Sequence, residues 1–144
     1  RDQPRVAEHD LAQHGILASL HSLLETFKLP DLSKELEYSN ALANYLKSAL
    51  PEDARIEREY RHEGTTCDIF IAYQNEEAFL EVKWKLARKA DYDRLIGQVE
   101  GLKPKKNNVV VVLIGDTNQQ LLGRLNEHFA GQVKEKRVAI ESVR

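Results

Sequence analysis

Two carboxylates and a lysine lie close together in two short apolar segments of the sequence. Asp68 opens the run "DIFIAY", and Glu81 and Lys83 stand one residue apart inside "AFLEVKWKL". Charged side chains are seldom buried without a partner. Two neighbouring carboxylates can share a hard cation such as Mg²⁺ or Mn²⁺, and a lysine beside them can orient or deprotonate an attacking water. The three residues therefore predict a metal-dependent hydrolytic site.

The two segments have the pattern of a β-hairpin, with "QNEE" between them. A turn of Asn75 and Glu76, or one of four residues, sets Asp68 opposite Lys83 and Phe70 opposite Glu81. Side chains alternate between the two faces of a strand, so one face holds Asp68, Glu81 and Lys83. The other is predicted to be the core face, and it holds Cys67, Ile69, Ile71, Tyr73, Ala78, Leu80, Val82 and Trp84.

A purely structural explanation covers only part of this pattern. An exposed ion pair between Asp68 and Lys83 would stabilise the fold by at most about 1 kcal/mol. That explanation leaves Glu81 without a role, whereas a metal site uses all three charged groups.

The rest of the chain supplies the elements that would position these residues. Apolar periodicity predicts helices over 6–28, from about 31 to 50, and over about 88–102. Strands are predicted at "RIEREYR", at the hairpin segments, at "NNVVVVLIGD" and at "RVAIESV", with a helix in "TNQQLLGRLNEHF". The order ααβββαβαβ predicts an α/β fold with a mixed central sheet flanked by helices.

Composition excludes several classes of protein. The 144 residues predict one globular domain, and no apolar run is long enough for a membrane span. The single cysteine, Cys67, excludes an internal disulfide and favours the cytoplasm. The five histidines lack the spacing of a zinc site. Because there is no methionine, we expect a further segment before Arg1.

Basic residues gather just after the hairpin, although the net charge is −2. Between residues 83 and 106 there are eight basic residues and three acids. The basic residues are Lys83, Lys85, Arg88, Lys89, Arg94, Lys103, Lys105 and Lys106. Such a window suits a phosphate backbone, although a solvated helix face would have the same composition.

The segments "TTCDIFIAY" and "AFLEVKWKL" resemble the PD-(D/E)xK nuclease superfamily, whose restriction-endonuclease-like core has the order αβββαβ. That order is matched by residues 32–114. The resemblance implies that Asp68 and Glu81 bind Mg²⁺ or Mn²⁺ and that Lys83 activates water. It also implies a helix glutamate, for which Glu35 fits best and Glu37 is the alternative.

The nearest branches are the RecB-type nucleases and the archaeal Holliday-junction resolvases, which carry a glutamine on the next helix. Gln98 stands at that position and would hold Lys83 or the scissile phosphate. Cys67 replaces the motif proline, and Leu102 replaces a tyrosine common in the RecB-type branch. Residues 31–144 are therefore expected to form the nuclease-like domain, and residues 1–30 an N-terminal helical extension outside the resemblance.

The expected function is hydrolysis of phosphodiester bonds in DNA, with no membrane partner and with a homodimer left open. Four basic residues are expected to contact the DNA backbone, namely Lys85, Arg88, Lys89 and Arg94. The alternative is a catalytically inactive nuclease-fold module that binds nucleic acid or a protein partner.

Overall fold

The computed structural model describes residues 8–144, and side chains from Gly15 onward. The elements are α1 (Glu8–Thr26), α2 (Glu35–Ala49), β1 (Arg55–His62), β2 (Thr65–Tyr73), β3 (Glu76–Trp84), α3 (Lys89–Gly101), β4 (Val109–Ile114), α4 (Gln119–His128), α5 (Ala130–Lys134) and β5 (Val138–Val143). The predicted order is confirmed, with the short α5 added before the last strand. Residues 6 and 7 of the first predicted helix lie outside the described residues.

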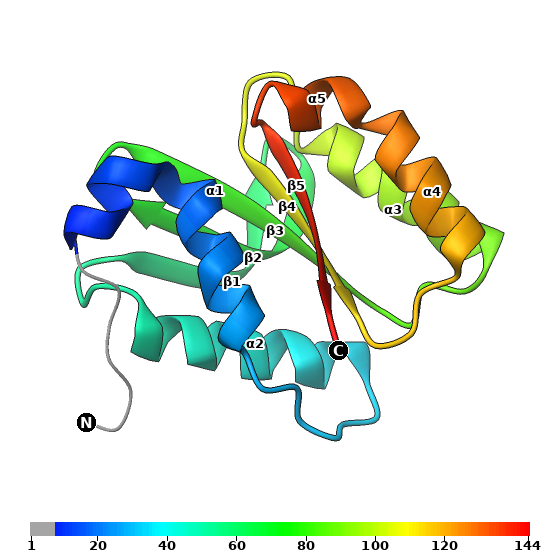
Figure 1. Ribbon diagram of the computed structural model, residues 1–144, viewed down its shortest axis with the longest axis horizontal. Helices are drawn as coiled ribbons and strands as arrows, with labels where there is room; N and C mark the ends of the chain where they lie inside the picture. The colour runs from blue at the N-terminus through cyan, green and yellow to red at the C-terminus, as the bar shows by residue number, and fades with distance from the viewer. Residues whose placement is uncertain (1–7) are drawn as a thin grey trace.

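A five-stranded mixed sheet forms the centre of the molecule, in the order β1-β2-β3-β4-β5 (Figure 1). The first three strands are antiparallel, and β3, β4 and β5 are parallel. All six residues of β4 are buried, as expected for a central strand covered on both faces. The predicted α/β class with a mixed sheet is therefore confirmed.

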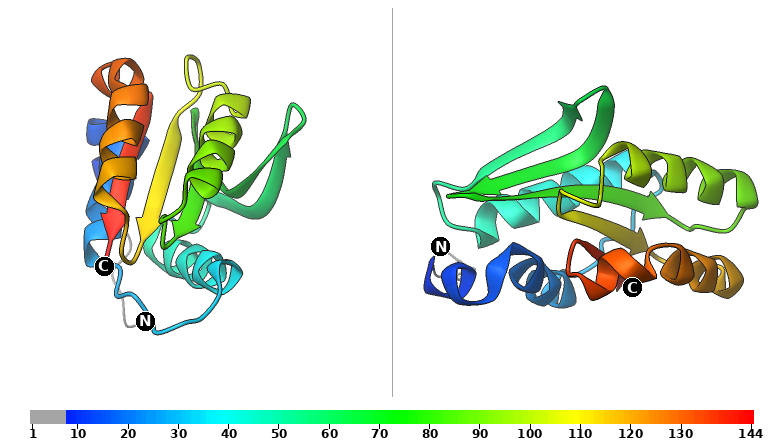
Figure 2. Two further views of the ribbon diagram at one scale, coloured as in Figure 1. Left: turned by 90° about the vertical axis from the view of Figure 1, so that its right-hand side faces the viewer. Right: turned by 90° about the horizontal axis from the view of Figure 1, so that it is seen from above.

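Helices cover both faces of the sheet (Figures 1 and 2). Leu20 of α1 and Leu42 of α2 pack with Ile69, Leu80 and Val82 on one face. Apolar residues of α3 and α4 pack on the other face, in a cluster that includes Phe70, Phe79, Leu95 and Leu125. The alternation predicted for the hairpin is therefore correct for these strand residues. Trp84 is half-buried against the first cluster and contacts the ring of Tyr38.

The predicted register of the hairpin is wrong by two residues. The turn takes Gln74 and Asn75, with Gln74 at a φ of 54°, and Phe70 pairs with Phe79 instead of Glu81. If the pairing is continued in this register, Asp68 lies across from Glu81 and not from Lys83. Because the shift is an even number of residues, Glu81 and Lys83 keep the face that was predicted for them.

Cys67 also lies on the other side of the sheet from the one predicted. It is fully buried in the cluster of Phe70 and Phe79. Strict alternation fails here because pairing between β1 and β2 is interrupted at Asp68, opposite Glu59 at a φ of 51°. Burial is the main cause that raises the pKa of the Cys67 thiol to about 12, so this cysteine is not a nucleophile at neutral pH.

Helix α1 is kinked at Gly15, whose φ of 80° is readily adopted by glycine. The backbone N–H of Ile16 after the kink donates to Glu76 Oε1 at 3.1 Å. A carboxylate from the start of β3 thus caps the second part of α1. No helix in the described part of the chain has the length and apolarity that a membrane-spanning segment needs.

Candidate active site

The candidate site lies where β2 and β3 separate. Their backbone pairing ends at Ile69 and Leu80, whereas β3 stays paired with β4 as far as Trp84. The N–H groups of Val82 and Trp84 therefore have no β2 backbone partner. Asp68 Oδ2 accepts from Val82 N at 2.7 Å, and Glu35 Oε2 accepts from Trp84 N at 2.8 Å. Two side-chain carboxylates thus accept the hydrogen bonds that backbone carbonyls of β2 would otherwise accept.

Glu81 lies beside this opening and is the most unusual residue of the site. Its side chain is on the face of β3 that carries Phe79, and the residue is only 2% exposed. Its Oε1 atom is buried and has no hydrogen-bond partner among the described residues. Burial, followed by the charge of Asp68, raises the pKa of Glu81 to about 8. The carboxylate accepts one hydrogen bond from the backbone of Asp68, but a buried carboxylate oxygen without a partner destabilises a fold, so the fold alone does not account for Glu81.

Asp68 shares this environment to a lesser degree. Burial is the largest cause that raises the pKa of its carboxyl, and the charge of Glu35 adds to it. The hydrogen bond from Val82 N and the charge of Lys83 act in the opposite direction. Asp68 and Glu81 are thus two carboxylates in a poorly hydrated place where both cannot easily carry charge.

Lys83 lies among these acids. Its Nζ atom is 3.8 Å from Glu35 Oε2, and its side chain is 12% exposed. Its positive charge acts to lower the pKa of Asp68 and of Glu81, against the larger effect of burial. It also contributes to the lowered pKa of Asp91 on α3. The site therefore combines three carboxylates with one nearly buried ammonium group.

The structure places Glu35, and not Glu37, at the site. Glu35 is the first residue of α2 and reaches β3, whereas Glu37 accepts from the backbone N–H of Ser33 at 3.2 Å. Lys34 precedes the helix and makes no side-chain cap. A carboxylate at this end of α2 is favoured by the helix dipole.

The other predicted site residues are placed less directly. Gln98 is half-buried on α3, and within the described chain its side chain has no hydrogen bond to Lys83. Lys85 lies over the ring of Trp84, with Nζ 4.7 Å from the ring centroid. The remaining three basic residues form ion pairs with acids of α3, namely Arg88 and Arg94 with Asp91, and Lys89 with Asp93.

Asp91 was not among the predicted site residues. Its carboxyl bonds Arg88 Nε at 3.2 Å and an Arg94 guanidinium nitrogen at 3.1 Å, and these bonds with the nearby charges lower its pKa. The spacing of Arg88, Asp91 and Arg94 at three-residue intervals was the available signal. These pairs neutralise much of the predicted cationic helix face.

The carboxylates of Asp68, Glu81 and Glu35 are suitable ligands for a divalent cation, although they are not yet arranged around one point. Within residues 8–144, no group of three or more His, Cys, Asp and Glu side chains is already arranged around one point as metal ligands. Asp68 and Glu35 each use one oxygen on a backbone N–H. The unpaired Oε1 of Glu81 and the second oxygen of Asp68 are the atoms that such a cation could use.

Comparison with known proteins adds information about the fold. No known family model matches the sequence, and no curated protein matches it. Among solved structures, SfsA from Pyrococcus furiosus, solved in complex with Ca²⁺, is similar at a TM-score of 0.44 and 18% identity, over 87% of this chain and 54% of SfsA. A protein of unknown function, AF1548, is similar at a TM-score of 0.50 and 8% identity, over 76% of this chain and 58% of that protein.

This chain therefore spans less than two thirds of either solved protein. At 8% identity, the likeness to AF1548 concerns the fold alone, and the looser likeness to SfsA carries no weight. The chemistry of the site has to be argued from its own residues.

Proposed function

We propose that this protein is a metal-dependent nuclease of the PD-(D/E)xK kind that hydrolyses phosphodiester bonds in DNA. The observation that carries the proposal is Glu81, buried to 2% exposure with one unpaired carboxylate oxygen beside Asp68. Such an arrangement is costly in an empty protein and becomes favourable when a cation joins the two carboxylates. The resemblance of the two hairpin segments to the superfamily and the αβββαβ order support it.

Asp68 and Glu81 would hold Mg²⁺ or Mn²⁺, with Glu35 assisting directly or through a water. The bound cation would polarise the scissile phosphate and increase the acidity of a water. Lys83, within 4 Å of Glu35, would orient the attacking water or accept its proton. Gln98 would contact Lys83 or the phosphate after a change of side-chain rotamer, and Lys85, Arg88, Lys89 and Arg94 would contact the DNA backbone.

The direct test is cleavage of plasmid, single-stranded and branched DNA in Mg²⁺, Mn²⁺ or EDTA. We expect wild type to cleave only with a metal and Lys83→Ala to lose about 10²-fold or more of the rate, as for loss of a general base. A suitable control is Lys28→Ala, which removes an exposed cation that none of the proposed contacts uses. Equal cleavage by wild type and Lys83→Ala would contradict the role of Lys83, and no cleavage by wild type would contradict the proposal.

A second function is favoured by one specific observation. Asp68 and Glu35 both act as hydrogen-bond acceptors for β3, so the carboxylates also have a structural use. A catalytically inactive module that binds nucleic acid or a protein partner could retain them for that reason. Metal-independent DNA binding without cleavage would support this alternative.

A further inference from the structure

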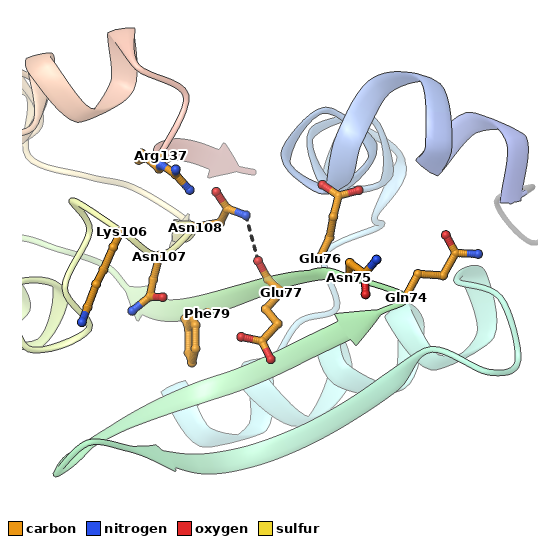
Figure 3. Close-up of a pocket in the computed structure, with 9 residues that line it drawn as sticks. All are labelled: Gln74, Asn75, Glu76, Glu77, Phe79, Lys106, Asn107, Asn108 and Arg137. Atoms are coloured by element: carbon orange, nitrogen blue, oxygen red, sulfur yellow. Dashed lines mark hydrogen bonds between the residues drawn. The ribbon is translucent and has the colours of Figure 1, made fainter.

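A second polar surface lies at the opposite end of β3 from Lys83. A cleft of about 670 Å³ opens between the tip of the β2–β3 hairpin and the loops that precede β4 and β5 (Figure 3). The hairpin wall includes Gln74 and Glu77. The loop wall includes Lys106, Asn107, Asn108 and Arg137.

Two cations line this cleft, Lys106 and Arg137. Together with their chain neighbours Lys105 and Lys136 they form what we call the loop patch. They come from two segments that lie side by side, since Val109 N donates to Arg137 O at 2.8 Å. Neighbouring hollows are lined by Lys105 and Lys106 on one side and by Lys136 and Asn108 on the other. The patch is therefore a continuous surface, although its members are about 30 residues apart in the sequence.

The cations of the loop patch differ from those beside the carboxylates. Within the described chain, none of the four forms an ion pair. The acids around the patch are Glu76 and Glu77, which line the cleft, and Glu100, which lines the neighbouring hollow with Lys105 and Lys106. Glu63 already bonds Lys103 at 2.8 Å and His62 at 2.9 Å. On α3, by contrast, Arg88, Lys89 and Arg94 are all paired with acids of the same helix. The loop patch therefore gathers four cations that no acid of the described chain pairs with.

Helix dipoles do not explain this surface. A cation in the last turn of a helix is stabilised by the dipole, but the effect falls off within that turn. Lys103, two residues after α3, could benefit from it. Lys106 lies five residues after α3, and Arg137 three residues after the five-residue α5, so both are beyond its range.

The cleft also offers neutral polar groups that suit a nucleic acid strand. Asn107 and Asn108 supply side-chain amides beside the two cations, although each also bonds a backbone carbonyl, Leu102 O and Glu77 O respectively. Amide, lysine and arginine side chains are typical contacts to phosphate and sugar. Glu77 is the opposing group: it is exposed on the hairpin wall, and Phe79 lies between it and Lys106 in Figure 3.

We propose that the loop patch and its cleft bind the phosphate backbone of a DNA strand, as an anchor separate from the carboxylate site. Phe79, which lines the cleft, shares a face of β3 with Glu81 and is two residues away, roughly 7 Å along the strand. A duplex turn of about 34 Å covers both places. The inference rests on the proposed function for its choice of DNA, but it concerns binding and not cleavage.

The test measures binding of a short labelled duplex by fluorescence anisotropy in EDTA, over a series of salt concentrations. We expect the double variant Lys106→Ala with Arg137→Ala to bind more weakly and to reduce the salt slope of log K by about 2, that is by about 1 for each lost phosphate contact. The matched control is Lys28→Ala with Arg144→Ala, which removes the same charge. We expect Glu77→Gln to tighten binding, because it removes one of the two carboxylates of the cleft and leaves Glu76.

Three outcomes would overturn the inference: no binding by wild type, equal weakening by both double variants, or a patch that binds anionic vesicles in preference to DNA. Thermal unfolding of each variant shows whether the fold is retained. Cleavage is measured separately, so the two proposals can fail independently. If wild type does not cleave but the double variant still loses binding, the nuclease proposal fails and the loop patch stands.

Discussion

At the scale of single residues, the proposed function depends most on Glu81. A buried carboxylate with an unpaired oxygen is a cost that a stable fold would normally avoid. Costs of this kind concentrate at functional sites, where a ligand or substrate offsets them. The burial of Glu81 therefore leads to two predictions, one for the protein without metal and one for the protein with metal.

Without metal, Glu81→Gln should stabilise the protein at pH 8 and have little effect at pH 5. The folded-state pKa of Glu81, about 8, lies above its ordinary value of 4.5, so between these values the folded protein binds more protons than the unfolded one. Stability therefore falls as pH rises through this window. We expect the variant to be more stable by about 1–3 kcal/mol at pH 8, measured by urea unfolding in EDTA.

Because the pKa of Asp68 is also raised, the stability of Glu81→Gln should still fall as pH rises, but less steeply than that of wild type. The control is Glu77→Gln, which makes the same substitution at an exposed residue outside the carboxylate cluster. An equal effect of Glu81→Gln at pH 5 and pH 8 would show that the carboxyl is not protonated in the folded protein.

With metal, wild type should gain thermal stability that Glu81→Gln does not. A cation that binds only the folded state adds about 2.7 kcal/mol at a hundred times its dissociation constant. The unfolding temperature in Mn²⁺ and in EDTA checks this without any activity measurement. Here too Glu77→Gln is the control, and a similar shift for all three proteins would place the bound metal elsewhere.

At the scale of elements, the separation of β2 from β3 creates the site. Asp68 and Glu35 accept hydrogen bonds from the backbone N–H groups of β3 that β2 leaves free. The position of β2 therefore determines where these two carboxylates bind. Helix α3 fixes one end of that strand: a Cβ built at Gly101 would lie 2.5 Å from Thr65 Oγ1. The close approach of α3 to the start of β2 requires glycine at residue 101.

Gly101→Ala should therefore destabilise the protein by about 1–3 kcal/mol, as expected for overpacking. Gly97→Ala is the matched control on the same helix, because a Cβ there meets nothing within 4 Å. An alanine in an open helical position should stabilise by about 0.5–1 kcal/mol. The two free energies of unfolding should differ in sign, and Thr65→Ala should relieve the cost in Gly101→Ala.

At the scale of the whole molecule, α1 is joined to the far edge of the sheet. His21 of α1 bonds Glu141 of β5, with Nδ1 2.8 Å from Oε1, and Glu25 lies 3.7 Å from the other ring nitrogen. The hydrogen bond and charge of Glu141 raise the pKa of His21 above 6.5. The contact connects segments that are 120 residues apart.

This contact should stabilise the fold only while His21 is protonated. Because its folded-state pKa is raised, the contribution is complete below pH 6.5 and is lost as pH rises through the folded-state value. His21→Gln should therefore cost more stability at pH 5.5 than at pH 8.5, by under about 1 kcal/mol for so exposed a pair. NMR titration of the ring measures the pKa directly, and a value at or below 6.5 would contradict the expectation.

The whole molecule also divides its positive charge in a way that composition does not reveal. The cationic window of residues 83–106 is continuous in sequence but falls in two places in the fold. Arg88, Lys89 and Arg94 in its helical part are paired with Asp91 and Asp93. Lys105 and Lys106 instead lie on the loop before β4, beside Arg137 and Lys136 on the loop before β5, and Figure 3 shows Lys106 and Arg137 there. Within the described chain this second group forms no ion pair, so a partner can bind it without displacing an acid.

The sequence alone determined which face of β3 each side chain occupies. Alternation is a local property of an extended chain, so Glu81 and Lys83 were placed opposite Leu80 and Val82 without knowledge of any neighbour. The continuous apolar run of β4 likewise determined a central strand, because no other position buries both faces.

The tertiary structure decided what lies next to what. The choice of Gln74 and Asn75 as the turn moved Asp68 from Lys83 to Glu81, and a register depends on the turn and on packing instead of on alternation. The angle at which α2 meets the sheet brought Glu35 to β3 in preference to Glu37. The ion pairs of α3 are local, so the spacing of Arg88, Asp91 and Arg94 was enough to predict them. The cations of the loop patch come from two separate segments, so only the fold could bring them together.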